Sequence, residues 1–169
     1  MRKTRFNPGA VFAELLAALQ AACAAHYGNR LISLAVFGSV GRGAMRPDSD
    51  IDLLIVADPL PSGRLARVQD FAPVRKALEP KLMAARADGV QTRWAPLFKT
   101  PAETALHPSI ILDMTEDARI LYDRAGFLNC QLDGLRARLK ELGARRVWQG
   151  EFWWWDLKPD YKPGEVFAL

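Results

Sequence analysis

The sequence predicts an α/β (α+β) fold in which helices flank a small mixed β-sheet, and three observations support it. β-rich stretches alternate with helical ones along the chain, which is typical of a sheet covered by helices. The 169 residues are 50% hydrophobic and 25% charged, as expected for one globular domain with its own core. No repeat or low-complexity linker interrupts the chain, so we expect residues 1–169 to form a single domain.

The first half of the chain gives the clearest element boundaries. Residues 8–27 predict a helix, because apolar residues recur at helical spacing until Gly28 ends the run. β-rich stretches at 31–37 and 50–57 predict two strands. Residues 64–86 predict a helix that its two prolines bend or break.

The second half continues the same alternation. Residues 90–97 predict a third strand, and a capping box beginning at Thr100 predicts a short helix. Residues 118–122 have the composition of a short strand or a helix end. An amphipathic helix follows over 127–142, ended by Gly143. The sequence therefore predicts a small sheet with at least three strands.

A glycine-serine turn and two acidic residues carry the strongest functional signal. Gly38 and Ser39 directly follow the first strand, and Asp50 and Asp52 open the second. Side chains alternate along a strand, so the two carboxylates point to the same side. Together they repel each other unless a cation lies between them, and Mg²⁺ takes such oxygen ligands along with substrate phosphates. Since the turn offers backbone N–H groups and a hydroxyl to a phosphate, we expect a metal and triphosphate site.

This segment resembles the signature of the polymerase-β-like nucleotidyltransferase superfamily, Gly-Ser-x₃-Gly-x₅-Ser-Asp-x-Asp-Leu. The resemblance covers about residues 30–122 and implies the palm-like fold of that superfamily. In its small size the chain is similar to the minimal nucleotidyltransferases. Seven positions match in register, namely Gly38, Ser39, Gly43, Ser49, Asp50, Asp52 and Leu53.

The resemblance implies transfer of a nucleoside monophosphate from a nucleoside triphosphate, with ATP as the expected donor, to an acceptor hydroxyl. Asp50 and Asp52 would be the catalytic residues and the ligands of Mg²⁺, with room for two ions. In the connecting loop, Arg42 and Arg46 either steady the triphosphate or are solvated. The nucleotide-binding residues that follow are Gly38, Ser39, Arg42, Gly43 and Ser49.

One departure from the family pattern bears on catalysis. Members usually carry a third carboxylate on the next core strand, but residues 90–96 contain no acid, and Gln91 or Arg93 falls at the expected position. Asp88 and Asp113 are the nearest substitutes. An alternative to the enzyme is therefore a binding module of the same fold, which holds a nucleotide or a partner protein without turnover.

The resemblance also suggests a partner. Minimal nucleotidyltransferases are commonly paired with a small helical HEPN protein, and some act as antitoxins that adenylylate it. The net charge of +4 and the pI near 9.3 suit an anionic substrate but leave nucleic-acid binding open. No stretch approaches the roughly 20 apolar residues of a membrane span, so we expect a cytoplasmic protein.

The segment 127–169 lies outside the resemblance. Its cluster of Trp153, Trp154 and Trp155 either covers the core, lines a pocket, stacks on bases or joins subunits of a homo-oligomer. Core packing is the favoured interpretation. The basic stretch from Arg136 to Arg146 is expected to be a solvated face, with a partner or RNA contact as the alternative.

Overall fold

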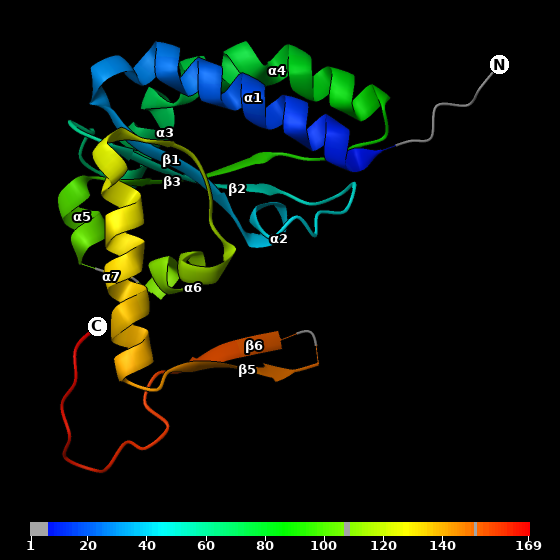
Figure 1. The fold of residues 1–169 in the computed structure, drawn as a ribbon. Helices are drawn as coiled ribbons and strands as arrows, with labels where there is room; N and C mark the ends of the chain where they lie inside the picture. Colours follow the sequence, from blue (N-terminus) through cyan, green and yellow to red (C-terminus); the bar gives the residue numbers. More distant parts are fainter. Residues whose placement is uncertain (1–6, 107–108, 151) are drawn as a thin grey trace.

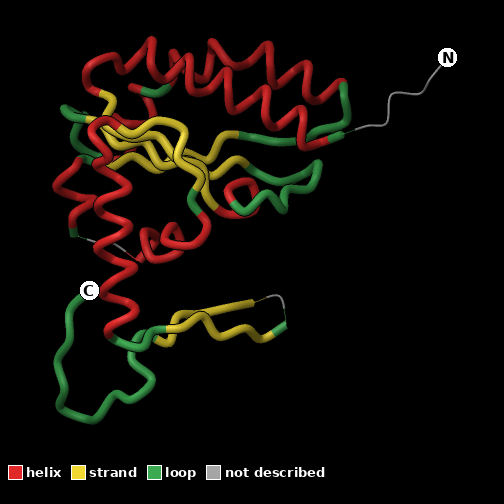
Figure 2. The backbone as a smooth tube through the Cα atoms, in the orientation of Figure 1, coloured by secondary structure: helices red, strands yellow, loops and turns green. Residues whose placement is uncertain are grey.

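The computed structural model describes residues 7–106, 109–150 and 152–169. At its centre lies a four-stranded sheet with the order β3-β2-β1-β4 (Figures 1 and 2). The middle strand β1 (Leu31–Phe37) pairs antiparallel with β2 (Ile51–Ala57) and with β4 (Arg119–Asp123), while β3 (Trp94–Lys99) runs parallel to β2. This mixed sheet confirms the predicted fold class.

Helices cover both faces of the sheet (Figure 1). On one face α1 (Pro8–Tyr27) packs beside α4 (Ala72–Ala87), and on the other lie α6 (Ser109–Asp117) and α7 (Phe127–Glu141). Each face buries its own cluster of apolar side chains. The helical residues buried in the α1–α4 layer include Phe12, Leu15, Leu19, Val74 and Leu78, and those of the α6–α7 layer include Ile111, Met114, Leu128, Leu132 and Leu135.

The alternation of side chains along β2 fixes the direction in which its polar residue points. Ile51 and Leu53 belong to the α1–α4 cluster, whereas Leu54 and Val56 belong to the α6–α7 cluster. Asp52 lies between the first two, so its side chain is on the α6–α7 side of the sheet. The predicted metal ligand therefore shares that side with two helices.

The third strand starts later than predicted. The strand was expected over 90–97, and the structure has it over Trp94–Lys99. It starts late because the residues before β3 form hydrogen bonds to the loop that precedes β2. The Gln91 N–H donates to the carbonyl of Pro47 at 2.7 Å, and the Thr92 hydroxyl donates to the carbonyl of Ser49, also at 2.7 Å. These bonds tie the start of β3 to the loop that carries the acidic residues.

The predicted helix over 64–86 is broken once. α3 (Arg64–Asp70) ends before Phe71, and α4 starts directly after it with Pro73 in its first turn. A proline is tolerated there because the N–H groups of a first turn have no partner within the helix. Pro80 lies inside α4 and does not end it, so of the predicted bend or break at this proline the break is wrong.

Short elements complete the domain. α2 (Gly38–Gly41) directly follows β1, and the predicted capping box of Thr100 and Glu103 begins α5 (Pro101–Ala105). Of the predicted residues 118–122, all but the first are part of the strand β4, so they are not a helix end. Helix α6 was not predicted from the sequence. Two single 3₁₀ turns, Gly28–Arg30 and Arg124–Gly126, precede β1 and α7.

The tryptophan-rich tail forms a β-hairpin, which the sequence did not predict. β5 (Arg145–Gln149) pairs antiparallel with β6 (Phe152–Asp156). Figure 1 shows the hairpin beyond the end of α7, on the side of the sheet that α6 covers. The expectation of a solvated basic stretch is wrong for Arg146, whose side chain is only 7% exposed.

Within the described residues, one helical stretch is long and apolar enough to cross a membrane by length and composition alone. It spans Pro8–Arg30, with a mean hydropathy of 1.5. The expectation that no stretch approaches this length is therefore wrong, since alanines make up much of the apolar content. In the structure, Phe12, Leu16 and Cys23 on one side of this helix are buried in the core of the domain.

Candidate active site

The glycine-serine turn and the acidic strand meet at Gly38. Phe37, the last residue of β1, pairs with Asp52, which brings the turn directly beside that carboxylate. A Cβ atom on Gly38 would lie 2.6 Å from Asp52 Oδ2, and the φ angle of Gly38 is +64°. Only glycine meets both conditions, because any other residue would clash and would strain the backbone.

The two predicted metal ligands lie close enough to influence each other. Asp50 immediately precedes β2 and Asp52 is its second residue. Partial burial raises the pKa of the Asp52 carboxyl, and the negative charge of Asp50 raises it further. An ionised Asp52 is thus held at an energetic cost, which a cation between the two carboxylates would relieve.

Arg93, one of the two residues expected at the position of a third carboxylate, contacts Asp50. Arg93 Nε and Nη2 each lie 2.8 Å from Asp50 Oδ2. In the parallel pairing of β2 and β3, Ala95 is opposite Asp52. That Gln91 or Arg93 falls at the position of the third carboxylate stays a prediction, and β3 itself contains no acid. The Arg93 side chain is 79% exposed.

The two substitute carboxylates are engaged elsewhere. Asp113 on α6 accepts a hydrogen bond from Trp155 Nε1 at 3.1 Å. Asp88 follows the last turn of α4 and lines a small groove with Glu14 of α1, on the opposite face from Asp52. Within the part of the chain that the structure describes, no three His, Cys, Asp or Glu residues are placed to hold a metal ion. The pair is therefore not completed by either.

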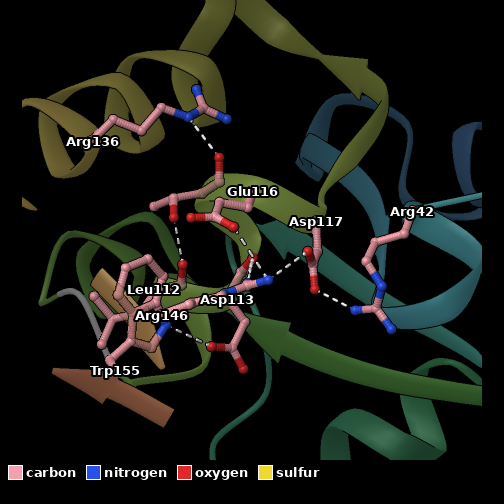
Figure 3. A network of polar contacts seen from close by, with 9 residues as sticks. Arg42, Leu112, Asp113, Glu116, Asp117, Arg136, Arg146 and Trp155 are labelled. Atoms are coloured by element: carbon pink, nitrogen blue, oxygen red, sulfur yellow. Dashed lines mark hydrogen bonds and ion pairs between the residues drawn. The ribbon is translucent and has the colours of Figure 1, made fainter. Parts of the chain in front are cut away.

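A buried charge cluster joins the turn to α6 and to the hairpin (Figure 3). Asp117, at the end of α6, accepts a hydrogen bond from Arg42 on one oxygen and from Arg146 on the other, the latter at 3.0 Å. Its side chain is 4% exposed. The backbones of α2 and α6 also approach each other closely here, since a Cβ atom on Gly41 would lie 2.1 Å from the Asp117 carbonyl oxygen. Arg42 is therefore fixed in place beside the turn.

Other predicted nucleotide-binding residues shape the loop between β1 and β2. Ser49 Oγ accepts a hydrogen bond from the Arg46 N–H at 2.9 Å, which closes the loop on itself. The Arg46 side chain is solvated and lies 3.7 Å from the exposed Asp48 carboxylate. Gly43 has a φ of +72° and forms a turn in the open part of the loop. In this structure the Ser49 hydroxyl therefore stabilises the conformation of the loop.

A surface cavity of about 600 Å³ borders this region at the edge of the sheet. It lies between α3, α4 and β3, and Phe71, Leu82 and Trp94 line its apolar part. Its rim is basic, with Arg64, Arg75, Arg86 and Arg93. Arg93 is the residue that it shares with the carboxylate pair, so the cavity adjoins the site without containing Asp52.

Sequence reasoning missed Asp117 and Arg146. Asp113 and Asp117 are four residues apart, so a helix over this stretch would present both on one face. The signal was hidden because α6 itself was not predicted. Arg146 gave no local signal at all, since its burial depends on partners 29 and 33 residues away in sequence.

The fold and the carboxylate pair beside a glycine-serine turn define a nucleotidyltransferase. The family model described as "Nucleotidyltransferase domain" matches residues 18–113, which is more than half of the chain, and the chain belongs to this family. A curated relative from Methanocaldococcus jannaschii, "Putative protein adenylyltransferase MJ1305", is 28% identical over 122 residues, covering 71% of this chain and 78% of the relative.

Two solved structures are similar to the chain. One is a crystal structure of a toxin-antitoxin with AMP-PNP, with a TM-score of 0.40 and 16% identity. The other is a mutant of the toxin-antitoxin MntA-HpeT, with a TM-score of 0.40 and 14% identity. In each case the match covers 80% of this chain and 92% of the other.

Proposed function

We propose that the protein transfers a nucleoside monophosphate, with ATP as the donor, to a hydroxyl group of a protein acceptor. The observation that carries the proposal is the contact between Gly38 and Asp52, with Asp50 beside them. The turn at Gly38, which only glycine can form, lies directly against the Asp52 carboxylate, whose ionisation costs free energy. Such an arrangement has no stabilising role of its own, which supports a binding role for it.

The reaction would proceed by displacement at the α-phosphorus of the triphosphate. The acceptor oxygen forms a bond to that phosphorus, the bond to the bridging oxygen of the β-phosphate breaks, and pyrophosphate leaves with the bonding electrons. The acceptor proton passes to solvent or to a nearby carboxylate. The turn at Gly38 and Ser39 would hold the phosphates, and Arg42, held by Asp117, would add positive charge beside them.

Asp50 and Asp52 would hold the metal ion. Two carboxylates with hard oxygen donors, one of them half-buried, suit Mg²⁺. When bound, a divalent ion would neutralise phosphate charge and polarise the reacting oxygen atoms. Arg93, which now contacts Asp50, could replace part of the charge of a second ion but could not act as a general base.

A protein acceptor is supported by the name of the relative, which is given as a protein adenylyltransferase. The resemblance to minimal nucleotidyltransferases makes a small HEPN-type protein the first candidate acceptor. Its hydroxyl-bearing side chains, Ser, Thr or Tyr, would receive the adenylyl group.

A second candidate function is a binding module without turnover. The observation that favours it is the pairing of Arg93 with Asp50, together with Ala95 opposite Asp52. A guanidinium group on one carboxylate competes with a metal ion for it. In that case the protein would bind the nucleotide or the partner and release both unchanged.

The test compares binding with transfer. Calorimetry with a non-hydrolysable ATP analogue should show Mg²⁺-dependent binding that the double substitution Asp50→Asn and Asp52→Asn removes. Asp48→Asn is the matched control, since it removes one carboxylate from the exposed part of the same loop. Incubation with radiolabelled ATP and a HEPN-type protein should then label that protein.

The outcomes separate the two functions. Binding without label transfer or pyrophosphate release, across several acceptors and all four triphosphates, would favour the binding module. Equal affinity of the double variant and the wild type would contradict the carboxylate site itself.

A further inference from the structure

The C-terminal hairpin lies on the same side of the sheet as the carboxylate pair. Asp52 points to the α6–α7 side, and Trp155 of the hairpin packs against the apolar cluster of that side. Trp155 and Arg146 also bind α6, through the Asp113 side chain and the Asp113 carbonyl. The hairpin is therefore attached to the layer that faces the predicted active site (Figure 1).

The strand register decides which side chains the hairpin turns toward α6. Directly opposite residues of an antiparallel pair share one face, and residues two apart on a strand share it too. Trp148 pairs with Trp153, and Arg146 pairs with Trp155. These four side chains form the inner face of the hairpin, whereas Trp154 and Phe152 lie on the outer face.

Aromatic and cationic groups are interleaved on this inner face. The Arg146 guanidinium lies 4.2 Å from the centroid of the Trp153 ring and 5.3 Å from that of Trp155. The Trp148 and Trp153 rings are 6.3 Å apart and tilted by 53°. Because Arg146 is fixed by α6, it also fixes the orientation of the neighbouring aromatic rings.

The same arginine connects this face to the glycine-serine turn. Arg146 and Arg42 bind the two oxygens of one buried carboxylate, Asp117 (Figure 3). Arg42 immediately follows the helix α2 that begins at Gly38. A continuous path of side-chain contacts therefore leads from the turn to the aromatic rings.

The end of the inner face is open. Trp148 is 57% exposed, although it is on the face that α6 covers farther along, at Arg146 and Trp155. An indole held in place and left uncovered can stack against a planar ring, and base–aromatic stacking tolerates any base. Preorganised rings also lower the entropic cost of binding.

We propose that Trp148 and Trp153 form the stacking surface for the base of the nucleotide whose phosphates lie at Gly38 and Ser39. This inference rests on the proposed function and extends it, since it gives the hairpin the base-binding part of the same site. Stacking would recognise a planar aromatic ring as such, and it would discriminate only weakly among the four bases.

The experiment separates the base from the phosphates by using two probes in the presence of Mg²⁺: a non-hydrolysable ATP analogue and inorganic tripolyphosphate. For Trp148→Ala we expect the affinity for the ATP analogue to fall by about 5- to 100-fold, the range that corresponds to base stacking. The affinity for tripolyphosphate should stay at the wild-type value. Trp148→Phe keeps an aromatic ring and should recover most of the loss.

Trp154→Ala is the matched control, because it removes a half-exposed tryptophan from the outer face of the same hairpin. It should leave the affinity for both probes unchanged. A thermal unfolding midpoint for each variant verifies that the domain remains folded. Trp148 is suited to the test because the Arg146 guanidinium lies over the rings of Trp153 and Trp155, so the substitution keeps both cation–π contacts.

Each outcome decides something. A wild-type protein that binds neither probe would contradict the proposed function and this inference with it. A wild-type protein that binds both probes, with Trp148→Ala retaining the affinity for the ATP analogue, would overturn this inference alone. Equal weakening of both probes, or a loss of partner binding with nucleotide affinity unchanged, would also overturn it and would assign the hairpin a structural or partner-binding role.

Discussion

Two arginine–carboxylate contacts border the predicted nucleotide site. They join the same chemical groups but differ in how far the groups are buried. Arg93 binds Asp50 at the open end of the site, where the guanidinium is exposed to solvent. Arg146 binds Asp117 at the closed end, where both side chains are buried and Arg42 shares the carboxylate. The first contact can exchange with water or a metal ion at little cost. The second cannot exchange so easily, because Arg146 and Asp117 are both buried, and breaking their contact leaves Arg146 with the exposed Glu116 carboxylate at 3.3 Å.

This difference suggests a division of roles within the site. The closed end holds α2, α6 and the hairpin in a fixed arrangement, so the groups beside the turn are preorganised. The open end keeps Asp50 accessible, with an arginine that a cation can displace. Burial, and not the identity of the residues, decides which of the two contacts stabilises the fold.

The largest effect is expected at the closed end. Asp117→Ala removes the buried carboxylate from Arg146 and leaves it with the exposed Glu116 at 3.3 Å, which should lower the free energy of unfolding by about 3 kcal/mol, the lower end of the range for a broken buried ion pair. Urea unfolding measures this change. Asp133→Ala is the control, since Asp133 makes an exposed contact with Arg136 on α7 and should change little. If Asp117→Ala changed the free energy of unfolding as little as Asp133→Ala, the closed end would stabilise the fold no more than an exposed contact does.

The next effect tests the contact between the turn and β2. Gly38→Ala forces the Asp52 carboxylate to move and should lower the affinity for Mg²⁺ by about 10–100-fold, the range found when a residue that orients a metal ligand is changed. Gly43→Ala is the control, because its φ is also positive but nothing lies within 4 Å of the added methyl group. Calorimetric titration with Mg²⁺ distinguishes them. Equal losses in the two variants would attribute the effect to backbone strain.

A smaller effect concerns the pH dependence of stability. Because the pKa of Asp52 is raised in the folded state, its ionisation destabilises the fold as pH rises above the usual aspartate value of about 3.9. Asp52→Asn should therefore be more stable than the wild type at pH 7, and this advantage should vanish at pH 3. Unfolding in urea at both values measures it. An advantage that persists at pH 3 would point to a cause other than charge.

The smallest effect on stability is expected at the open end. Arg93→Gln removes an exposed contact and should leave the free energy of unfolding within measurement error. The same change frees Asp50, so the affinity for Mg²⁺ should rise. Arg75→Gln, which removes a charge from the same surface cavity without touching Asp50, is the control. A marked loss of stability in Arg93→Gln would show that the open end also supports the fold.

The parts of the fold that could be predicted are those with short-range causes. The apolar run of β1 and the turn at Gly38 are local patterns that the structure reproduces, whereas Asp50, predicted to open the second strand, lies one residue before β2. The start of β3 could not be predicted, because the hydrogen bonds of Gln91 and Thr92 go to a loop more than 40 residues earlier. The hairpin was missed because a run of tryptophans gives no sign of where its partners lie.

By itself the chain determined its family and placed Asp50 and Asp52 beside the start of one strand, because the motif that carries both is continuous in sequence. Tertiary structure alone decided that an arginine and not a third acid meets Asp50, and that Asp117 joins Arg42 to Arg146. The physical reason is distance along the chain. Arg42 and Asp117 are 75 residues apart, and only the packing of α6 between the sheet and the hairpin brings their charges together.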